Sequence, residues 1–410
     1  MMGVLPTDSE YDLFCNQRLH DPYPLFARLR QEDPVHWCEP MNMWLLTRYD
    51  DISRLIRDNK RLISDRQSMY TDTLRPENLE SASPLVRHIG LWLQNNNPPN
   101  HTRLRKLVNV AFTPRMIEDL EPRIEEIVND LLDKASKSGE TDFIQSFCLP
   151  LPAIVICEML GIPPEHRERY RDAVEGLIPF ASGGGPGLND AVGPARDCLD
   201  ELIAFFDELI MERRANPTED LISALAGVEE DGDRLTKEEL FALCVFLFLA
   251  GHETTMGLLA GGTLGLLQNR DQFDLLKSDP GTHIDKAVEE IVRYECPVTR
   301  AVRVPTEDIE VRGKTIKKGD TITMLLGAAN RDPAVFSEPD RLDITRHPNK
   351  HLGFGLGIHF CLGAPLARRE GRIAFPAIAK RFPTMKLATE AVDYKRALGI
   401  RSILSLPVTF

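Results

Sequence analysis

The feature that most constrains the fold is a helical pattern over residues 235–267, which is apolar on every side from Phe241 to Leu249. A helix without a polar face has to be surrounded by other elements, so it lies at the centre of a large fold. Thr236 and Glu239 stand at the spacing of a capping box, which marks the start of this helix. We therefore expect a buried central helix inside a thick shell of further elements.

The remaining elements are also mostly helical. Apolar residues at helical spacing predict helices over residues 21–32, 48–58, 101–112, 115–137, 144–160, 189–214 and 362–381. Strand patterns are few, and they cover residues 35–38, 44–47, 309–311, 315–316 and 321–326. Because strands and helices do not alternate along the chain, the predicted fold class is mainly α with small β-sheets. The glycine-rich segment 181–187 is interpreted as a mobile lid between helices rather than as a domain linker.

The composition is that of a large acidic chain. Of its 410 residues 42% are hydrophobic, and its formal net charge is −13. Because negative charge repels nucleic acid and anionic lipid, we expect neither as a partner. No run approaches about 18 uninterrupted apolar residues, so we expect no membrane span. The first residues lack a basic segment followed by a long apolar run, so we expect no signal peptide.

The eight cysteines form no CxxC pair and no regular spacing. This pattern argues against a zinc site and against a disulfide framework. Most of them stand in apolar runs, where a cysteine serves as a small buried hydrophobe, and we adopt that interpretation for seven of the eight. The cysteine usage predicts a reducing, cytoplasmic location. The eighth is Cys361.

Cys361 follows a glycine-rich loop and precedes a helical pattern, in the stretch FGLGIHFCLG of residues 354–363. At a helix N-terminus, free N–H groups and the helix dipole favour a thiolate. Three interpretations are open: an inert buried cysteine, a nucleophile with His359 as its base, or the axial ligand of a haem iron. We favour the ligand, because few cysteine nucleophiles need several glycines and an upstream phenylalanine.

Residues 354–363 match every fixed position of the pattern F-x-x-G-x-[HR]-x-C-x-G, and in this the chain resembles the cytochrome P-450 family, soluble bacterial type. The resemblance extends over essentially the whole chain. It implies a single cytochrome P-450 domain over residues 1–410, with a helix-rich core and a minor β-rich part. It also implies haem b (iron protoporphyrin IX) between the long central helix and the helix after the cysteine loop, with Cys361 as the ligand of the iron.

The middle of the central helix reads Ala250-Gly251-His252-Glu253-Thr254, which puts an acid and a hydroxyl in an apolar run. Such groups are costly to bury unless they are paired or functional. A core threonine can also bond to the carbonyl four residues earlier, which is the plain structural interpretation. The stretch resembles the family pattern [AG]-G-x-[DE]-T. That resemblance implies that Glu253 and Thr254 are catalytic and deliver protons to dioxygen, that Ala250 borders the haem, and that Gly251 lets the helix open locally.

Several further positions match the family's haem contacts. Propionates need cationic or hydrogen-bonding partners, although any one such side chain could be a solvated surface charge. The stretch from Pro98 to Arg105 resembles the family's D-P-P-x-H-x-x-x-R. The resemblance implies propionate contacts from His101, Arg105, Arg303 and His359, and loop contacts from Phe354, Gly355 and Gly363.

Glu290 and Arg293 form an E-x-x-R pair, which alone is typical of a surface ion pair. The pair precedes residues 336–341, which resemble the family's F-x-x-P-x-R segment. The resemblance implies a buried charge network of Glu290, Arg293 and Arg341 that braces the haem-side loop.

The resemblance implies a monooxygenase that uses O₂ to hydroxylate or epoxidise a hydrophobic small molecule. Macrolides, terpenoids, steroids and fatty acids all fit, and bacterial secondary metabolism is the expected setting. One alternative is a peroxide-driven haem peroxygenase, against which the pair Glu253–Thr254 argues. Further alternatives are a non-catalytic haem-binding or sensor protein and a cysteine hydrolase.

Electrons are expected from a separate ferredoxin or flavodoxin with its reductase, because the chain carries no flavin or iron–sulfur motif. Such partners are usually acidic, so we expect a basic docking patch. The candidates for this patch are Arg368, Arg369, Arg372, Arg103 and Lys106.

Overall fold

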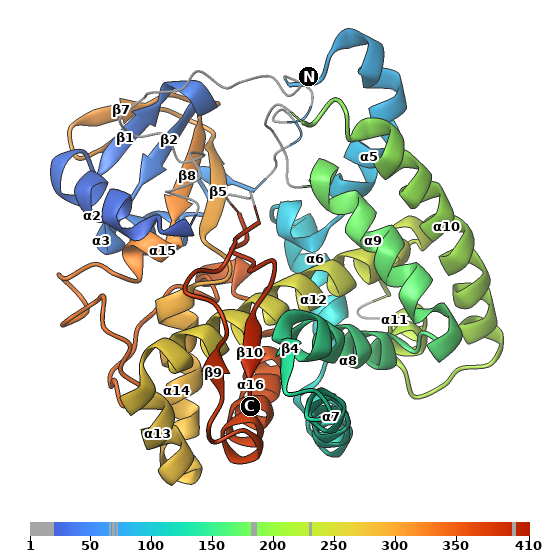
Figure 1. The fold of residues 1–410 in the computed structure, drawn as a ribbon. Coiled ribbons are helices and arrows are strands. Elements are labelled where there is room, and N and C mark those ends of the chain that lie inside the picture. The colour runs from blue at the N-terminus through green and yellow to red at the C-terminus, as the bar shows by residue number, and fades with distance from the viewer. Residues whose placement is uncertain are drawn as a thin grey trace. The chain divides into compact units, whose positions relative to one another are not determined.

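The computed structural model describes residues 20–64, 67, 70, 73–181, 187–228, 232–395 and 399–410 (Figure 1). The described residues form two compact units. The first unit holds residues 63–118 and 153–251, and the second holds residues 20–62, 119–152 and 252–410. The centre of the expected lid, residues 182–186, lies outside the described residues.

The first unit is helical. Its helices are α5 (Leu79–Gly90), α6 (Asn100–Ala111), α9 (Arg167–Ala181), α10 (Val192–Ala215), α11 (Leu221–Gly227), most of α8 (Pro150–Leu160) and the first half of α12 (Lys237–Gln268). Helices α9 and α10 lie side by side (Figure 1). The ring of Tyr170 packs edge-on against Phe206 at 5.4 Å and Phe248 at 4.7 Å between ring centroids. This aromatic cluster ties α9, α10 and α12 together. The short strand β3 (Leu62–Ile63) crosses the boundary between the units.

The strands of the second unit are short. Strands β1 (Val35–Cys38), β2 (Met43–Leu46), β8 (Thr321–Leu325) and β5 (Arg300–Pro305) are neighbours in this order in one sheet. Only the β2–β8 pairing among these is parallel. Strands β6 (Ile309–Val311) and β7 (Lys314–Ile316) form a hairpin, and β10 (Pro407–Thr409) pairs with β4 (Glu140–Asp142) and β9 (Lys386–Leu387). Helices α2 (Tyr23–Glu32), α3 (Tyr49–Leu55) and α15 (Leu326–Ala329) accompany the first sheet (Figure 1).

The helical part of the second unit gathers around the second half of α12. Its helices are most of α7 (Pro114–Ala135), α13 (Arg270–Ser278), α14 (Pro280–Glu295) and α16 (Ala364–Arg381). Gly262 of α12 has no room for a side chain, since an added Cβ would lie 2.5 Å from Phe375 of α16 and 2.8 Å from Ile291 of α14. The absent side chain lets α12, α14 and α16 meet closely.

Helix α12 confirms the predicted central helix. The backbone N–H of Thr236 donates to the Glu239 carboxylate at 3.0 Å, and the N–H of Glu239 donates to the Thr236 hydroxyl oxygen at 3.1 Å. This is the capping box that the sequence predicts. By length and composition α12 could cross a membrane, but 72% of its most apolar window is buried inside the protein, as expected of a core helix. The predicted fold class, mainly α with small sheets, is confirmed.

Candidate active site

Cys361 lies between a short 3₁₀ turn (Gly357–His359) and the start of α16, as the sequence predicts. Its backbone N–H donates to the carbonyl oxygen of Phe354 at 2.9 Å, which closes the loop. The guanidinium of Arg368 lies 4.5 Å from the centroid of the Phe354 ring and holds that ring from the α16 side. The loop is thus fixed at both ends, with the cysteine placed where helix N–H groups favour a thiolate.

The surroundings of Cys361 fit a flat prosthetic group held by one thiolate. Gly355 and Gly357 have φ of +69° and +73°, which residues with a side chain rarely adopt, and an added Cβ at Gly363 would meet no heavy atom within 4 Å. The Cys361 side chain is only partly buried, whereas Cys38, Cys148, Cys157, Cys244 and Cys296 are fully buried. Among the described residues no cluster of three or more His, Cys, Asp or Glu could hold a bare metal ion. The partly buried Cys361 thiol beside the open side of Gly363 suits a metal carried in a macrocycle.

The other cysteines mostly behave as predicted. Burial raises the pKa of the Cys157 thiol to about 12 and that of Cys296 to about 12, so both stay neutral. Cys198 is partly buried rather than buried, and Cys15 lies outside the described residues.

Glu253 is a buried acid with an ion-pair partner that sequence reasoning missed. Its side chain is 6% exposed, and its Oε1 accepts from the ammonium of Lys395 at 2.8 Å. Its Oε2 is buried and has no hydrogen-bond partner among the described residues. The neighbouring Thr254 is partly buried on the same helix. Gly251 lies within the bounds of helix α12.

The predicted haem contacts are divided between the two units. His101 and Arg105 lie on α6 of the first unit, where His101 is buried, and Ala250 lies on the first half of α12. Arg303 lies on β5 of the second unit and is 8% exposed. The second unit also contains the cysteine loop and both predicted catalytic residues, which lie on the second half of α12. Thus most, but not all, of the predicted set falls in one unit.

Comparisons with known proteins agree over nearly the whole chain. The family model for cytochrome P450 matches residues 282–395. The polyketide biosynthesis cytochrome P450 PksS of Bacillus subtilis (strain 168) is 40% identical over 399 residues, which are 95% of this chain and 96% of that protein. The 6-deoxyerythronolide B hydroxylase of Saccharopolyspora erythraea is 38% identical, over 95% of this chain and 96% of that protein. The chain belongs to the cytochrome P450 family.

Solved structures agree with this assignment. P450BioI, in a complex with an acyl carrier protein ligated to hexadec-9Z-enoic acid, matches this P450 with a TM-score of 0.88 at 36% identity, over 96% of this chain and 99% of that chain. Relatives of this P450 are named as hydroxylases and monooxygenases. It is a monooxygenase, and its family implies a haem-thiolate cofactor.

The E-x-x-R pair of this P450 is fully buried. Both Glu290 and Arg293 have side chains that are 0% exposed, and Arg293 donates to the two carboxylate oxygens at 2.7 and 2.8 Å. Arg293 also donates to the carbonyl oxygens of Asn330 at 2.9 Å and Pro339 at 2.7 Å. A buried ion pair needs such additional hydrogen bonds to offset the loss of water.

The third residue of this network is Arg346, and the prediction of Arg341 is wrong. The Nε of Arg346 lies 3.2 and 3.1 Å from the carboxylate oxygens of Glu290, and its side chain is only 10% exposed. The side chain of Arg341 is 56% exposed and pairs with Glu338 at 3.4 Å. Only the backbone carbonyl oxygen of Arg341 takes part, accepting from Arg293 at 3.0 Å. The two arginines are five residues apart in an irregular segment, where no periodicity tells which of them points inward.

The arginines of α16 that were expected to form a docking patch are paired within the protein. Arg368 binds both oxygens of Glu289 at 2.6 and 2.9 Å, and Arg372 lies 2.8 Å from Asp285. Arg369 pairs with Glu121. Within the first unit, Arg103 pairs with Glu239 and with Asp233 at 3.4 Å. These partners remove most of the surplus positive charge on which the expected patch depends.

Glu289 is held in its charged form by its partners. Burial alone would raise its pKa, but hydrogen bonds from His351 at 3.0 Å and from Arg368 outweigh burial and lower the pKa of Glu289 to about 2. His351 and Phe354 flank the start of the cysteine loop, with ring centroids 5.7 Å apart. This ion cluster therefore fastens α14 and α16 to the loop that carries Cys361.

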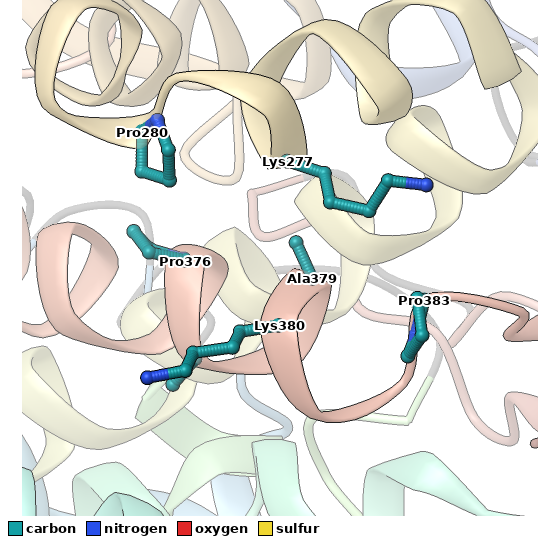
Figure 2. A pocket seen from close by; sticks show the side chains of 7 residues that line it. Lys277, Pro280, Pro376, Ala379, Lys380 and Pro383 are labelled. Carbon is teal, nitrogen blue, oxygen red and sulfur yellow. The ribbon is translucent and has the colours of Figure 1, made fainter.

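A surface pocket of the second unit is separate from these residues. Figure 2 shows it between the region where α13 gives way to α14 and the last turns of α16, and it is lined by Lys277, Pro280, Pro376, Ala377, Ala379, Lys380 and Pro383. The lining holds no acid, thiol or imidazole. None of the predicted site residues belongs to it, so it is not the candidate active site.

Proposed function

We propose that Cys361 would hold the iron of haem b through its thiolate in this monooxygenase, and that Glu253 and Thr254 deliver the protons that its reaction consumes. The observation that carries the proposal is the placement of Glu253: a 6% exposed acid beside a hydroxyl in an apolar helix, with one oxygen paired and the other without a partner among the described residues. Burial of such a group is expensive and calls for a function. A peroxide-driven enzyme or a haem sensor would leave the acid and the hydroxyl without a task.

The chain's other residues have distinct tasks in this proposal. His101, Arg105, Arg303 and His359 would bind the haem propionates through charge-assisted hydrogen bonds. Phe354, Gly355, Gly363 and Ala250 would border the macrocycle. When bound, the haem supplies the activation of O₂ and the insertion of one oxygen atom into the substrate. Glu253 takes up a proton from the solvent side and releases it on the inner side, with Thr254 as the hydroxyl that passes it on.

The substrate and partners follow from the relatives' names and from the chain's own chemistry. One relative is named for polyketide biosynthesis and another as a 6-deoxyerythronolide B hydroxylase. We therefore propose a hydrophobic small molecule of bacterial secondary metabolism, taken to a hydroxylated or epoxidised product. A separate ferredoxin or flavodoxin with its reductase would supply electrons. We further propose a cytoplasmic protein in which the two units make up one P450 domain.

The test compares Thr254→Ala and Glu253→Gln with Thr263→Ala. Thr263 is a buried threonine farther along α12 whose hydroxyl has no hydrogen-bond partner among the described residues. A compound that displaces water from the haem iron is first found by the shift that it causes in the Soret band of the protein. Turnover is then driven by a surrogate ferredoxin and reductase, and product and peroxide are counted per electron consumed.

Thr254→Ala is expected to bind haem and the compound normally but to release peroxide instead of product. Glu253→Gln is expected to slow turnover by about 10²–10⁴-fold, the usual contribution of a general acid. Thr263→Ala is expected to match the wild type. If Thr254→Ala and Glu253→Gln both keep the wild-type rate and the wild-type yield of product per electron, the assigned roles are refuted.

A further inference from the structure

Glu253 is joined to a residue of the C-terminal segment. The Lys395 ammonium lies 2.8 Å from Oε1 of Glu253, with 41% of the Lys395 side chain exposed and 6% of the Glu253 side chain exposed. The two residues are 142 positions apart in the chain. The pair therefore links a buried position in the middle of α12 to a side chain that reaches the solvent.

Lys395 lies on one of two antiparallel backbone segments, residues 393–395 and 401–404, which together are called the hairpin here. Tyr394 pairs with Ile403 in an antiparallel bridge, the N–H of Lys395 donates to the carbonyl oxygen of Ser402 at 2.8 Å, and the N–H of Leu404 donates to that of Asp393 at 2.8 Å. These backbone hydrogen bonds at Asp393 and Lys395 define where the Lys395 side chain starts. A lysine on a loose tail would lose more conformational entropy in forming an ion pair.

The hairpin is also fastened to its surroundings by Arg401. Its guanidinium lies 3.7 Å from the centroid of the Tyr394 ring and donates to the carbonyl oxygen of His20 at 2.7 Å. Its backbone N–H donates to the carbonyl oxygen of Pro297 at 2.8 Å. These contacts lie within the second unit, as do Glu253 and Lys395.

The same face of α12 that carries Glu253 packs directly on this hairpin. Gly257 is one turn after Glu253, and an added Cβ there would lie 3.1 Å from the backbone oxygen of Arg401 and 3.2 Å from Cβ of Pro297. Residues four apart share one helix face. The missing side chain at Gly257 thus allows the close approach that brings Lys395 within reach of the acid.

The two oxygens of Glu253 have different surroundings. Oε1 is held by the half-exposed ammonium, and the buried Oε2 has no hydrogen-bond partner among the described residues. Burying a carboxylate away from water is unfavourable unless a cation and hydrogen bonds compensate. Lys395 is the cation with which the structure pairs this carboxylate.

We propose that Lys395 is a positioning residue that holds Glu253 at the solvent edge of the proton path and leaves its second oxygen directed to the reaction. The proposal rests on the role given above to Glu253. In each cycle the carboxylate takes one proton from a solvent water, which becomes hydroxide neutralised by the buffer. The resulting carboxylic acid passes that proton inward and returns to the carboxylate paired with Lys395. Lys395 transfers no proton itself.

The test uses Lys395→Met, which keeps the length of the side chain but removes the cation, and Lys395→Arg, which keeps the cation. Lys386→Met is the control, since Lys386 is an exposed lysine of the same C-terminal region for which the structure gives no ion pair. Each change is also made in the Glu253→Gln background. Haem content shows that each variant folds. The shift of the Soret band on addition of the compound shows that the variant binds it.

The first readout is independent of turnover. Thermal midpoints of wild type, Glu253→Gln, Lys395→Met and the double variant form a double-mutant cycle, in which contacting residues give non-additive shifts. We expect the midpoint shift of the double variant to be smaller than the sum of the two single shifts. Additive shifts would overturn the proposal, because the pair would then be absent in solution.

The second readout is turnover in H₂O and in D₂O. Lys395→Met is expected to lose about tenfold in rate, to raise the solvent isotope effect and to release more peroxide, since small displacements of a catalytic group can cost up to about 10²-fold. Lys395→Arg is expected to restore most of the rate, and Lys395→Met should change nothing further in the Glu253→Gln background. If turnover is slowed in Glu253→Gln but equals that of the wild type in Lys395→Met, this proposal alone is overturned. Wild-type turnover in Glu253→Gln would instead overturn the proposed function.

Discussion

At the scale of single residues, Glu370 is a buried acid that the catalytic proposal does not use. It lies on α16 with 1% exposure, and its Oε2 has no hydrogen-bond partner among the described residues. Burial raises the pKa of Glu370 from 4.5 to about 8, so the folded protein carries it uncharged at neutral pH. Glu289, on the helix that packs against α16, has the opposite shift, to about 2.

These opposite shifts predict opposite pH dependences of stability. A carboxyl whose pKa is raised on folding contributes fully below the unfolded value of 4.5, and this contribution is lost as pH rises to about 8. Glu370→Gln should therefore become progressively more stable than wild type between pH 4.5 and about 8. For Glu289 the stabilising contribution is present above 4.5 and lost as pH falls to about 2, so Glu289→Gln should be less stable than wild type above 4.5.

Unfolding midpoints measured across this pH range check both statements. The Glu370→Gln midpoint should rise above wild type between pH 4.5 and about 8. The Glu289→Gln midpoint should fall below wild type between about pH 2 and 4.5 and keep that difference above 4.5. A Glu370→Gln difference that stays constant from pH 4 to 8 would show that this carboxyl is ionised in the folded protein.

At the scale of elements, the segment between α15 and α16 depends on a charge network that the sequence assigned to the wrong arginine. The carboxylate of Glu290 accepts from Arg293, from Arg346 and from Asn349 at 3.1 Å, and Oε1 also accepts from the backbone N–H of Asp343 at 2.9 Å. Removing one partner of such a buried network leaves charge uncompensated.

Arg346→Ala should therefore lower the free energy of unfolding by about 3–5 kcal/mol and reduce haem content. Arg341→Ala is the matched control, because its side chain is mostly exposed, and such changes usually stay within about 0.5 kcal/mol. Chemical denaturation with haem content measured in parallel distinguishes the two. Equal losses in both variants would contradict the assignment of Arg346.

The elements differ in how far the sequence could predict them. Helices with a strong local pattern, such as α7 and α10, were predicted within a few residues of their observed bounds. The predicted helix over residues 144–160 is instead a π-helical stretch, Ile144–Cys148, followed by α8. Helices α5, α9, α11 and α13 were not predicted.

At the scale of the whole molecule, the sequence predicts a candidate site where the residues concerned are neighbours in the chain. The cysteine loop and the acid–alcohol pair are short local patterns, so the sequence alone identified Cys361, Glu253 and Thr254 as candidates. Their long-range partners could not be identified in this way. Lys395 and Glu253 are 142 residues apart and Arg346 and Glu290 are 56 apart, and no local periodicity links such positions.

The docking patch expected for an electron-transfer partner also depends on long-range partners that the sequence does not reveal. A net charge of −13 and the internal pairing of Arg368, Arg369 and Arg372 leave little free positive charge on α16. Counting basic residues along a sequence overstates a docking patch when acidic partners come from distant segments, as Glu121 and Asp285 do here.

The central claim is that Cys361 is the thiolate ligand of the haem, and the carbon monoxide spectrum of the reduced protein tests it most directly. The wild-type adduct should show the Soret band for which the cytochrome P450 family is named, and Cys361→His should move the band to the position of a histidine-ligated haem. Cys198→Ser, which changes another described cysteine that is not fully buried, should keep the wild-type band. An unchanged band in Cys361→His would contradict the assignment.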